Sequence, residues 1–250
     1  MSSDGAAAHP SPLGGDPNSF GTDAFYAAIG RAFVTMCAVV PVLFLIELID
    51  TLTGSWLDHN AGIEPRHLRG LDGVLFAPFL HASFAHVTAN SVPLILLGTF
   101  VLAAGTRWFL LATAVIALVS GVGTWLFGSS NTVVVGASGV ILGYLGALLT
   151  RGIVERTWWN VAVGLLIALL YGWQIVTLVP TAKQVSWQAH LFGFLGGVLA
   201  AVLLRTRPLR PLRPWHRQSE GDSAGTSADP HHTVVLPTSQ DTVLLPPESS

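Results

Sequence analysis

A serine and a histidine in two separate apolar segments are the side chains of this sequence best suited to chemistry. Ser138 lies in a Gly-Ala-Ser-Gly stretch, residues 136–139, whose small side chains leave the serine hydroxyl accessible to a substrate. A serine hydroxyl is a poor nucleophile until a base removes its proton, and His190 is the buried base that a neighbouring segment offers. The two residues together would form a catalytic dyad.

Taken alone, Ser138 also fits a structural role in helix packing. The residues that follow it form a small-residue face of the kind used between membrane helices: Gly139, Gly143 and Gly146. His190 is likewise followed by Gly193 and Gly197, a spacing that lets one helix approach another closely. The two segments are therefore expected to pack together, with Gly136, Gly139 and Gly193 supporting the site.

Negative charge that develops on a substrate oxygen would need hydrogen-bond donors. The backbone N–H of Ser138 is one candidate, and His86 and Asn90 are two more, because residues four apart lie on one face of a helix. His81, five residues earlier, is expected to brace the preceding loop rather than to contact substrate. The apolar segments after the first contain no Asp or Glu, so the dyad would work without a carboxylate partner.

The residues that other intramembrane protease chemistries require are absent from the sequence. A zinc protease would show His-Glu-x-x-His on a helix, and an aspartic protease would need two aspartates within the membrane; the sequence has neither. The single cysteine, Cys37, lies in an apolar run and can form neither an internal disulfide nor a cysteine zinc site. We therefore expect no metal and no cofactor.

The composition predicts that these residues sit in a membrane protein. Of 250 residues, 51% are hydrophobic and 10% are charged, whereas about 25% are charged in an ordinary soluble domain. The formal net charge of -2 gives no broad positive surface, so nucleic acid is not an expected partner.

Six apolar runs are each long enough to cross the hydrocarbon core as a helix, which takes about 17 to 25 residues. Because backbone polar groups must be paired inside the bilayer, such runs favour helices. The fold class expected is an all-α bundle of six transmembrane helices, formed by residues 33–49, 87–104, 108–127, 133–149, 158–178 and 187–204.

The distribution of basic residues predicts the orientation of this bundle. If the N-terminus lies inside, nine of the 12 basic residues fall on the cytoplasmic side. The second, fourth and sixth runs then enter from the outer side, so the polar groups named above converge on the outer half. The expected organisation is a membrane domain, residues 33–205, between cytoplasmic and disordered tails, residues 1–32 and 206–250.

Two connecting regions have features of their own. The first outer loop, residues 50–86, mixes apolar and charged side chains and is expected to lie in the membrane interface. The C-terminal tail contains two near copies, Thr-Val-Val-Leu-Pro at 233–237 and Thr-Val-Leu-Leu-Pro at 242–246. These copies could dock a partner weakly by strand addition, or they arise by chance in a low-complexity tail.

Three motifs in this order resemble those of the rhomboid intramembrane serine proteases: Gly136-x-Ser138-Gly139, His81-x4-His86-x3-Asn90 and Ala189-His190-x2-Gly193. The resemblance covers about residues 33–205. It implies that Ser138 is the nucleophile, His190 the base, and His86 and Asn90 the oxyanion-stabilising pair. It also implies a membrane-embedded first outer loop, single-span membrane proteins as substrates, and a bacterial plasma membrane as the location.

The sequence departs from the family pattern at two places. Many members carry an aromatic residue four positions after the serine, where this chain has Leu142, with Tyr144 two places later. The Trp-Arg pair often found in the first outer loop is absent, and Arg66 and Arg69, with Glu64 as a partner, are candidate substitutes.

Two other functions remain open at this stage. An inactive rhomboid-like protein that binds membrane helices is suggested by Leu142, although the four site residues are all present. A small transporter or channel would show inverted repeats and interrupted helices, which the sequence lacks.

Overall fold

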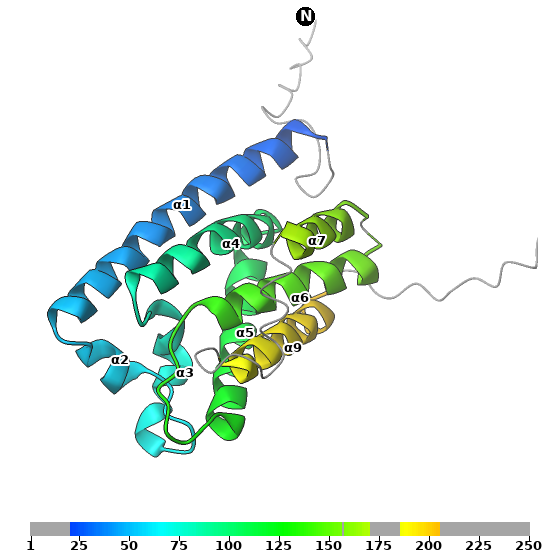
Figure 1. Cartoon of the computed structure of the whole chain (residues 1–250). Helices are drawn as coiled ribbons and strands as arrows, with labels where there is room; N and C mark the ends of the chain where they lie inside the picture. The colour runs from blue at the N-terminus through cyan, green and yellow to red at the C-terminus, as the bar shows by residue number, and fades with distance from the viewer. Residues whose placement is uncertain (1–20, 157, 171–185, 206–250) are drawn as a thin grey trace, which may run out of the picture. The chain divides into compact units, whose positions relative to one another are not determined.

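The computed structural model describes residues 21–156, 158–170 and 186–205, which all belong to one compact unit (Figure 1). Most of the two expected tails, both Thr-Val repeats and the end of the fifth apolar run lie outside the described residues. Within the described part of the chain, regular structure is helical, apart from one isolated bridge between Ile63 and Val134.

Each of the six apolar runs contains a helix, although the boundaries differ from the expected ones. The first helix begins at Asp23, inside the segment expected to be a tail, and the fourth begins at Ser138, five residues later than expected. The main helices are α1 (Asp23–Leu52), α4 (Phe84–Ala103), α5 (Thr106–Phe127), α6 (Ser138–Val154), α7 (Trp158–Leu170) and α9 (Trp187–Leu203).

The described helices support an all-helical membrane protein. Three of them, α1, α4 and α5, are long and apolar enough to cross a membrane, and α6 and α9 are shorter apolar helices. The figure of six spans remains a prediction.

Side-chain caps fix where two of the site-bearing helices start. The hydroxyl of Ser83 accepts a hydrogen bond from His86 N at 3.2 Å at the start of α4. The hydroxyl of Ser186 accepts one from Ala189 N at 3.3 Å at the start of α9. Such caps satisfy backbone donors that the first helical turn leaves unpaired. They therefore set the positions of His86 and His190.

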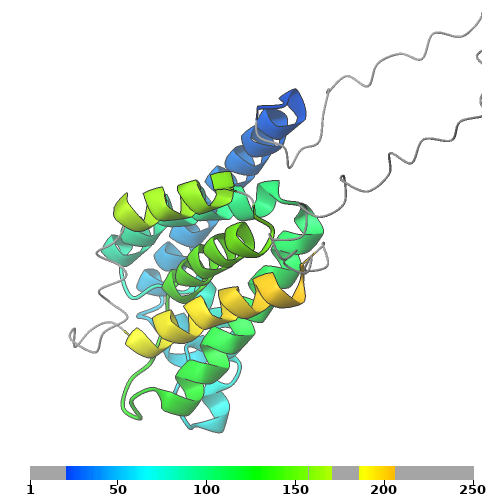
Figure 2. The same cartoon turned by 90° about the vertical axis from the view of Figure 1, so that its right-hand side faces the viewer.

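Helix α6 lies at the centre of the bundle, in contact with α4, α5, α7 and α9 (Figure 2). Most of its residues are buried, including Ile141, Leu145 and Leu148. At its C-terminal end the guanidinium of Arg151 is also buried, 2.9 Å from a Glu155 oxygen and 4.8 Å from the centroid of the Trp108 ring. A positive charge is favourable at the C-terminal end of a helix. The ion pair with Glu155 and the contact with the Trp108 ring together compensate the burial of the Arg151 charge.

The closest helix contact joins α6 to α9 and is made by backbone. A Cβ atom added to Gly193 would lie 2.1 Å from the carbonyl oxygen of Gly139, and one added to Gly197 would lie 1.8 Å from that of Gly143. Both distances are far below van der Waals contact, so only glycine permits this approach. The expected packing of the two segments is confirmed, and it places the N-terminal ends of α6 and α9 side by side.

The first outer loop folds into short helical pieces rather than one long element. They are α2 (Trp56–Ala61), η1 (Leu68–Gly70), α3 (Gly73–Phe76) and η2 (Ala77–Phe79). Several of its large apolar side chains are exposed, namely Trp56, Leu68, Leu71, Leu75, Phe76 and Phe79. An interfacial position for this loop remains a prediction.

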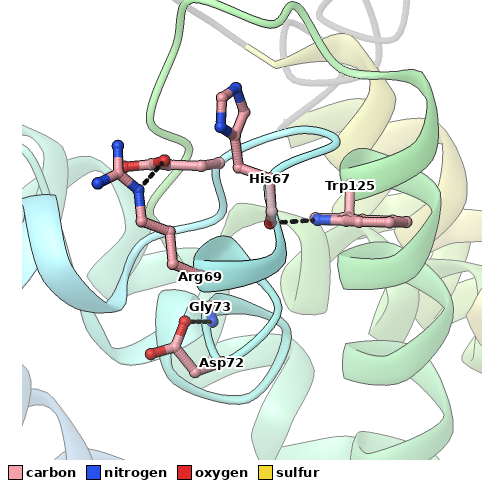
Figure 3. A network of polar contacts seen from close by, with 6 residues as sticks. His67, Arg69, Asp72, Gly73 and Trp125 are labelled. Atoms are coloured by element: carbon pink, nitrogen blue, oxygen red, sulfur yellow. Dashed lines mark hydrogen bonds and ion pairs between the residues drawn. The ribbon is translucent and has the colours of Figure 1, made fainter.

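Polar contacts hold the loop together and tie it to α5 (Figure 3). Arg69 Nε lies 3.0 Å from Glu64 Oε2, so the expected partnership of these two residues is confirmed. The indole of Trp125 donates to the carbonyl of His67 at 2.9 Å. Arg66 instead donates to the carbonyl of Gly128 at 2.8 Å, just beyond the end of α5. The loop is thus anchored to the segment that leads to Ser138.

The backbone contact between α6 and α9 predicts a strong effect of one methyl group. We expect Gly197→Ala to lower the free energy of unfolding by about 1–3 kcal/mol, because the helices must separate to admit the new Cβ. The control is Gly30→Ala in α1, where an added Cβ meets nothing within 4 Å and should change stability by less than about 1 kcal/mol. Denaturation in detergent micelles measures both. Equal stability of the two variants would contradict the proposed packing constraint.

Candidate active site

Ser138 and His190 lie in hydrogen-bond contact at the end of the bundle that carries the loop of residues 50–86. Ser138 is the first residue of α6 and His190 the fourth of α9. The Nε2 atom of His190 is 2.7 Å from the Ser138 hydroxyl oxygen. The imidazole is buried, whereas the serine is only partly so. A neutral imidazole in this geometry can accept the hydroxyl proton, as a general base must.

The pair faces a cavity of about 900 Å³. Its walls come from α3, α4, α5, α6, α9 and the segment 129–136. Four of the predicted site residues besides the dyad line it, namely His86, Asn90, Gly136 and Gly139. The cavity is large enough to hold several residues of a bound peptide next to the serine.

Gly136 lets the His86 imidazole approach the backbone in front of Ser138. Its φ of 125° falls where L side chains are strained, and an added Cβ would lie 2.7 Å from His86 Cε1. The N–H of Gly136 donates to the carbonyl of Ala77 at 2.9 Å, which fixes the segment against η2. Both the backbone conformation and the space therefore require glycine at this position.

Hydrogen-bond donors are available on the cavity side of Ser138. The bond from Ile141 N to Ala137 O, 3.0 Å long, is the first of the α6 ladder, so the N–H of Ser138 precedes it and has no partner within the helix. The side-chain amide nitrogen of Asn90 is buried and has no hydrogen-bond partner among the described residues. An unpaired buried donor is costly, and a negatively charged oxygen in the cavity would satisfy both groups.

His81 lies behind the site instead of in it. Its side chain is 1% exposed and does not line the cavity. Its Nε2 accepts a hydrogen bond from Ala137 N at 3.4 Å, and its ring meets that of His86 at a centroid distance of 5.0 Å. Burial, reinforced by the nearby His86, lowers the pKa of His81 to about 4. A neutral imidazole therefore holds the residue before Ser138 in place.

Gly139 and Gly193 meet at the crossing of α6 and α9, one turn or less from the dyad. An added Cβ at Gly139 would lie 3.0 Å from the carbonyl oxygen of Ala189, the residue before His190. The two glycines thus determine the distance between the backbones that carry Ser138 and His190.

Two groups near the site were not anticipated from the sequence. Ser120 of α5 donates its hydroxyl to the carbonyl of Ala189 at 2.8 Å. Gln188 donates to the carbonyl of Phe127 at 3.2 Å. A polar residue inside an apolar run could have drawn attention to Ser120. Serines in helices commonly bond within their own helix, however, so nothing in the sequence indicated a bond to another helix.

Tyr144 does not take the place of the missing aromatic residue beside the histidine. Its hydroxyl lies 2.8 Å from the Thr113 hydroxyl and its ring packs against Phe109, both on α5. Leu142 is buried in the core. The aromatic position of the family pattern is therefore filled by an aliphatic side chain.

Within the described residues, no three His, Cys, Asp or Glu side chains are grouped closely enough to hold a metal ion. The polar side chains around the cavity instead include several hydroxyls, among them Ser138, two imidazoles and two amides. This donor set suits acyl transfer through a nucleophile and a base.

Comparison with known proteins identifies the family. The model of the rhomboid domain matches residues 69–207. The uncharacterized protein Rv1337 of Mycobacterium tuberculosis is 44% identical over 191 residues, which are 73% of this chain and 79% of Rv1337. An uncharacterized protein of Mycobacterium leprae, ML1171, is 38% identical over 190 residues, 71% of this chain and 75% of the relative.

A more distant relative carries a functional description. The Bacillus subtilis protein YdcA, with a proposed assignment as a rhomboid protease, is 30% identical over 163 residues, 62% of this chain and 74% of YdcA. Together with the domain match, these relatives show that the chain belongs to the rhomboid family of integral membrane proteins. The resemblance inferred from the three motifs is confirmed.

The neutral His81 predicts a stability loss in acid. Because its pKa is about 4 in the folded protein and about 6.5 in the unfolded chain, protonation favours unfolding as the pH falls from about 6.5 towards 4. We expect the wild type to lose up to roughly 3 kcal/mol through this group, and His81→Gln to lose much less over the same range.

Thermal unfolding at pH 7 and at pH 4 measures this difference, with His67→Gln as the control because His67 is exposed. The control should follow the wild type. Parallel pH curves for wild type and His81→Gln would show that His81 is not the titrating group.

Proposed function

We propose that this rhomboid-family protein is an intramembrane serine endopeptidase that uses Ser138 and His190 as a dyad. The observation that carries the proposal is the 2.7 Å contact between His190 Nε2 and the Ser138 hydroxyl, in a cavity that the side-chain amide of Asn90, unpaired within the described part of the chain, also lines. Family membership supports the same reaction class. The substrates proposed are single-span membrane proteins, cut near their outer end.

The mechanism follows from the geometry. Ser138 Oγ attacks the carbonyl carbon of the scissile bond while His190 Nε2 takes the hydroxyl proton. The resulting oxyanion is held by the N–H of Ser138, the amide of Asn90 and the imidazole of His86. His190 then gives the proton to the leaving amine, which departs as the acyl-enzyme forms. A water molecule, deprotonated by His190, attacks the ester carbonyl. The bond to Ser138 Oγ then breaks, and His190 returns the proton to the serine oxygen as the acid product leaves.

The proposed orientation places both termini in the cytoplasm and opens the cavity to the outer side. It rests on the distribution of basic residues in the sequence. In this orientation water reaches Ser138 from the outer face, and a substrate needs only the outer end of its helix to enter the cavity.

Removing the nucleophile tests the proposal directly. We expect Ser138→Ala to abolish both cleavage of a labelled single-span substrate and labelling by a fluorophosphonate, because each needs the serine oxygen. The matched control is Ser91→Ala: Ser91 is also a helical serine, but its hydroxyl bonds to Val87 O in its own helix and it does not line the cavity.

The purified proteins are compared in detergent by gel and mass spectrometry. Cleavage by Ser138→Ala at the wild-type rate would refute the serine mechanism. A wild type that neither cleaves nor reacts with the probe would favour an inactive, helix-binding member, the alternative that Leu142 suggests.

The donors around the cavity predict a graded effect. We expect Asn90→Ala to lower kcat by about 10²–10³ with little change in KM, because a donor aimed at the oxyanion acts mainly in the transition state. The matched control is Asn60→Ala, since Asn60 is exposed and donates to Trp56 O within α2. Steady-state kinetics on a peptide substrate measures both variants, and an unchanged kcat for Asn90→Ala would exclude it from oxyanion binding.

A further inference from the structure

Ser120 differs from most other serines and threonines in the long helices in where its hydroxyl bonds. The hydroxyls of Ser91, Thr99 and Thr113 each donate to the carbonyl four residues earlier in the same helix. That is the usual way for a helical hydroxyl to be satisfied in an apolar environment. Ser120 instead donates to the carbonyl of Ala189, on α9, at 2.8 Å. This bond joins α5 to α9, so it does more than satisfy a hydroxyl inside its own helix.

The acceptor lies directly beside the proposed base. Ala189 precedes His190 in the first turn of α9, so fixing its carbonyl fixes the peptide group from which the His190 side chain extends. Ser120 itself is buried, with 7% of its surface exposed, and it lines the cavity next to the dyad. Its only role in the proposed reaction can be indirect, because its hydroxyl proton is committed to Ala189.

Gly139 meets the same two groups from the other side. A Cβ added to Gly139 would lie 2.4 Å from the Ser120 hydroxyl oxygen and 3.0 Å from the Ala189 carbonyl oxygen. Gly139 follows Ser138, and Ala189 precedes His190. The hydroxyl of Ser120 is therefore packed between the chain neighbours of the proposed nucleophile and of its base, where α5, α6 and α9 meet.

We propose that Ser120 is a positioning residue, which sets the place of His190 relative to Ser138 by holding the Ala189 carbonyl. The inference rests on the proposed serine protease function and adds a residue to it. Proton transfer requires heavy atoms within about 2.6–3.2 Å, and a displacement of about 1 Å can cost a hundredfold in rate. A bond one residue from the base is well placed to prevent such a displacement.

The start of α9 has other attachments, so loss of this bond should not unfold it. Ser186 caps the helix through Ala189 N, and Gln188 bonds to the carbonyl of Phe127 on α5. The Ser186 cap maintains the first turn of α9, and the Gln188 bond keeps that turn against the end of α5. The Ser120 bond is thus expected to affect the alignment of His190 more than the stability of the fold.

The test compares Ser120→Ala, Ser120→Cys, Ser91→Ala and Ser138→Ala with the wild type. For Ser120→Ala we expect kcat on a peptide substrate to fall about 10-fold or more with KM within about twofold, and the rate of fluorophosphonate labelling of Ser138 to fall in proportion. Ser120→Cys keeps a weak donor and should lose less. Ser91→Ala should keep wild-type kinetics.

The outcomes separate this inference from the proposed function. An active wild type with an equally active Ser120→Ala, or a Ser120→Ala that raises KM and leaves kcat unchanged, overturns the positioning role alone. A loss of kcat that Ser91→Ala shares, with the same fall in thermal stability, also overturns it, because general destabilisation then explains the effect. A wild type that neither cleaves nor labels overturns both proposals.

Discussion

The approach of two helix backbones at glycine is the constraint on which the rest of this structure depends. Because Gly139 and Gly143 on α6 face Gly193 and Gly197 on α9 without intervening side chains, the two helices lie closer than ordinary packing allows. The dyad follows from that distance. A serine at the start of one helix and a histidine in the first turn of the other come within 2.7 Å only because nothing separates the backbones behind them.

A second constraint acts on the segment in front of Ser138, and it comes from the first outer loop. Ile63 and Val134 exchange backbone hydrogen bonds of 3.0 and 2.9 Å, and Ala77 accepts another from Gly136. His81 adds a side-chain acceptor for the next residue, Ala137. The loop thus holds the residues that precede Ser138, and at Gly136 an added Cβ would collide with the His86 imidazole.

Much of this arrangement could be predicted from residue types alone. Histidine and asparagine are so few within or next to the apolar runs that His190, His86 and Asn90 stood out, Ser138 stood out by its Gly-x-Ser-Gly setting, and glycine spacing indicated which helices touch. Helix ends were less predictable: the run that begins at Val133 gives no sign of a later start, yet the helix starts only at Ser138. Val134, Gly136 and Ala137 instead donate hydrogen bonds from their backbone N–H groups to the loop of residues 50–86. Ser120 was missed for a related reason, since its bond to Ala189 depends on tertiary structure.

The cavity lies where the N-terminal ends of α4, α6 and α9 come together. Each such end carries a partial positive charge of roughly half a unit, made of backbone amides. In the proposed reaction this field favours the oxyanion without any charged side chain, and it belongs to the fold more than to any one residue. Substitutions at His86 or Asn90 would therefore weaken the electrostatic support but leave this part of it intact. That part of the stabilisation would persist in any variant of the lining side chains that leaves the three helix ends in place.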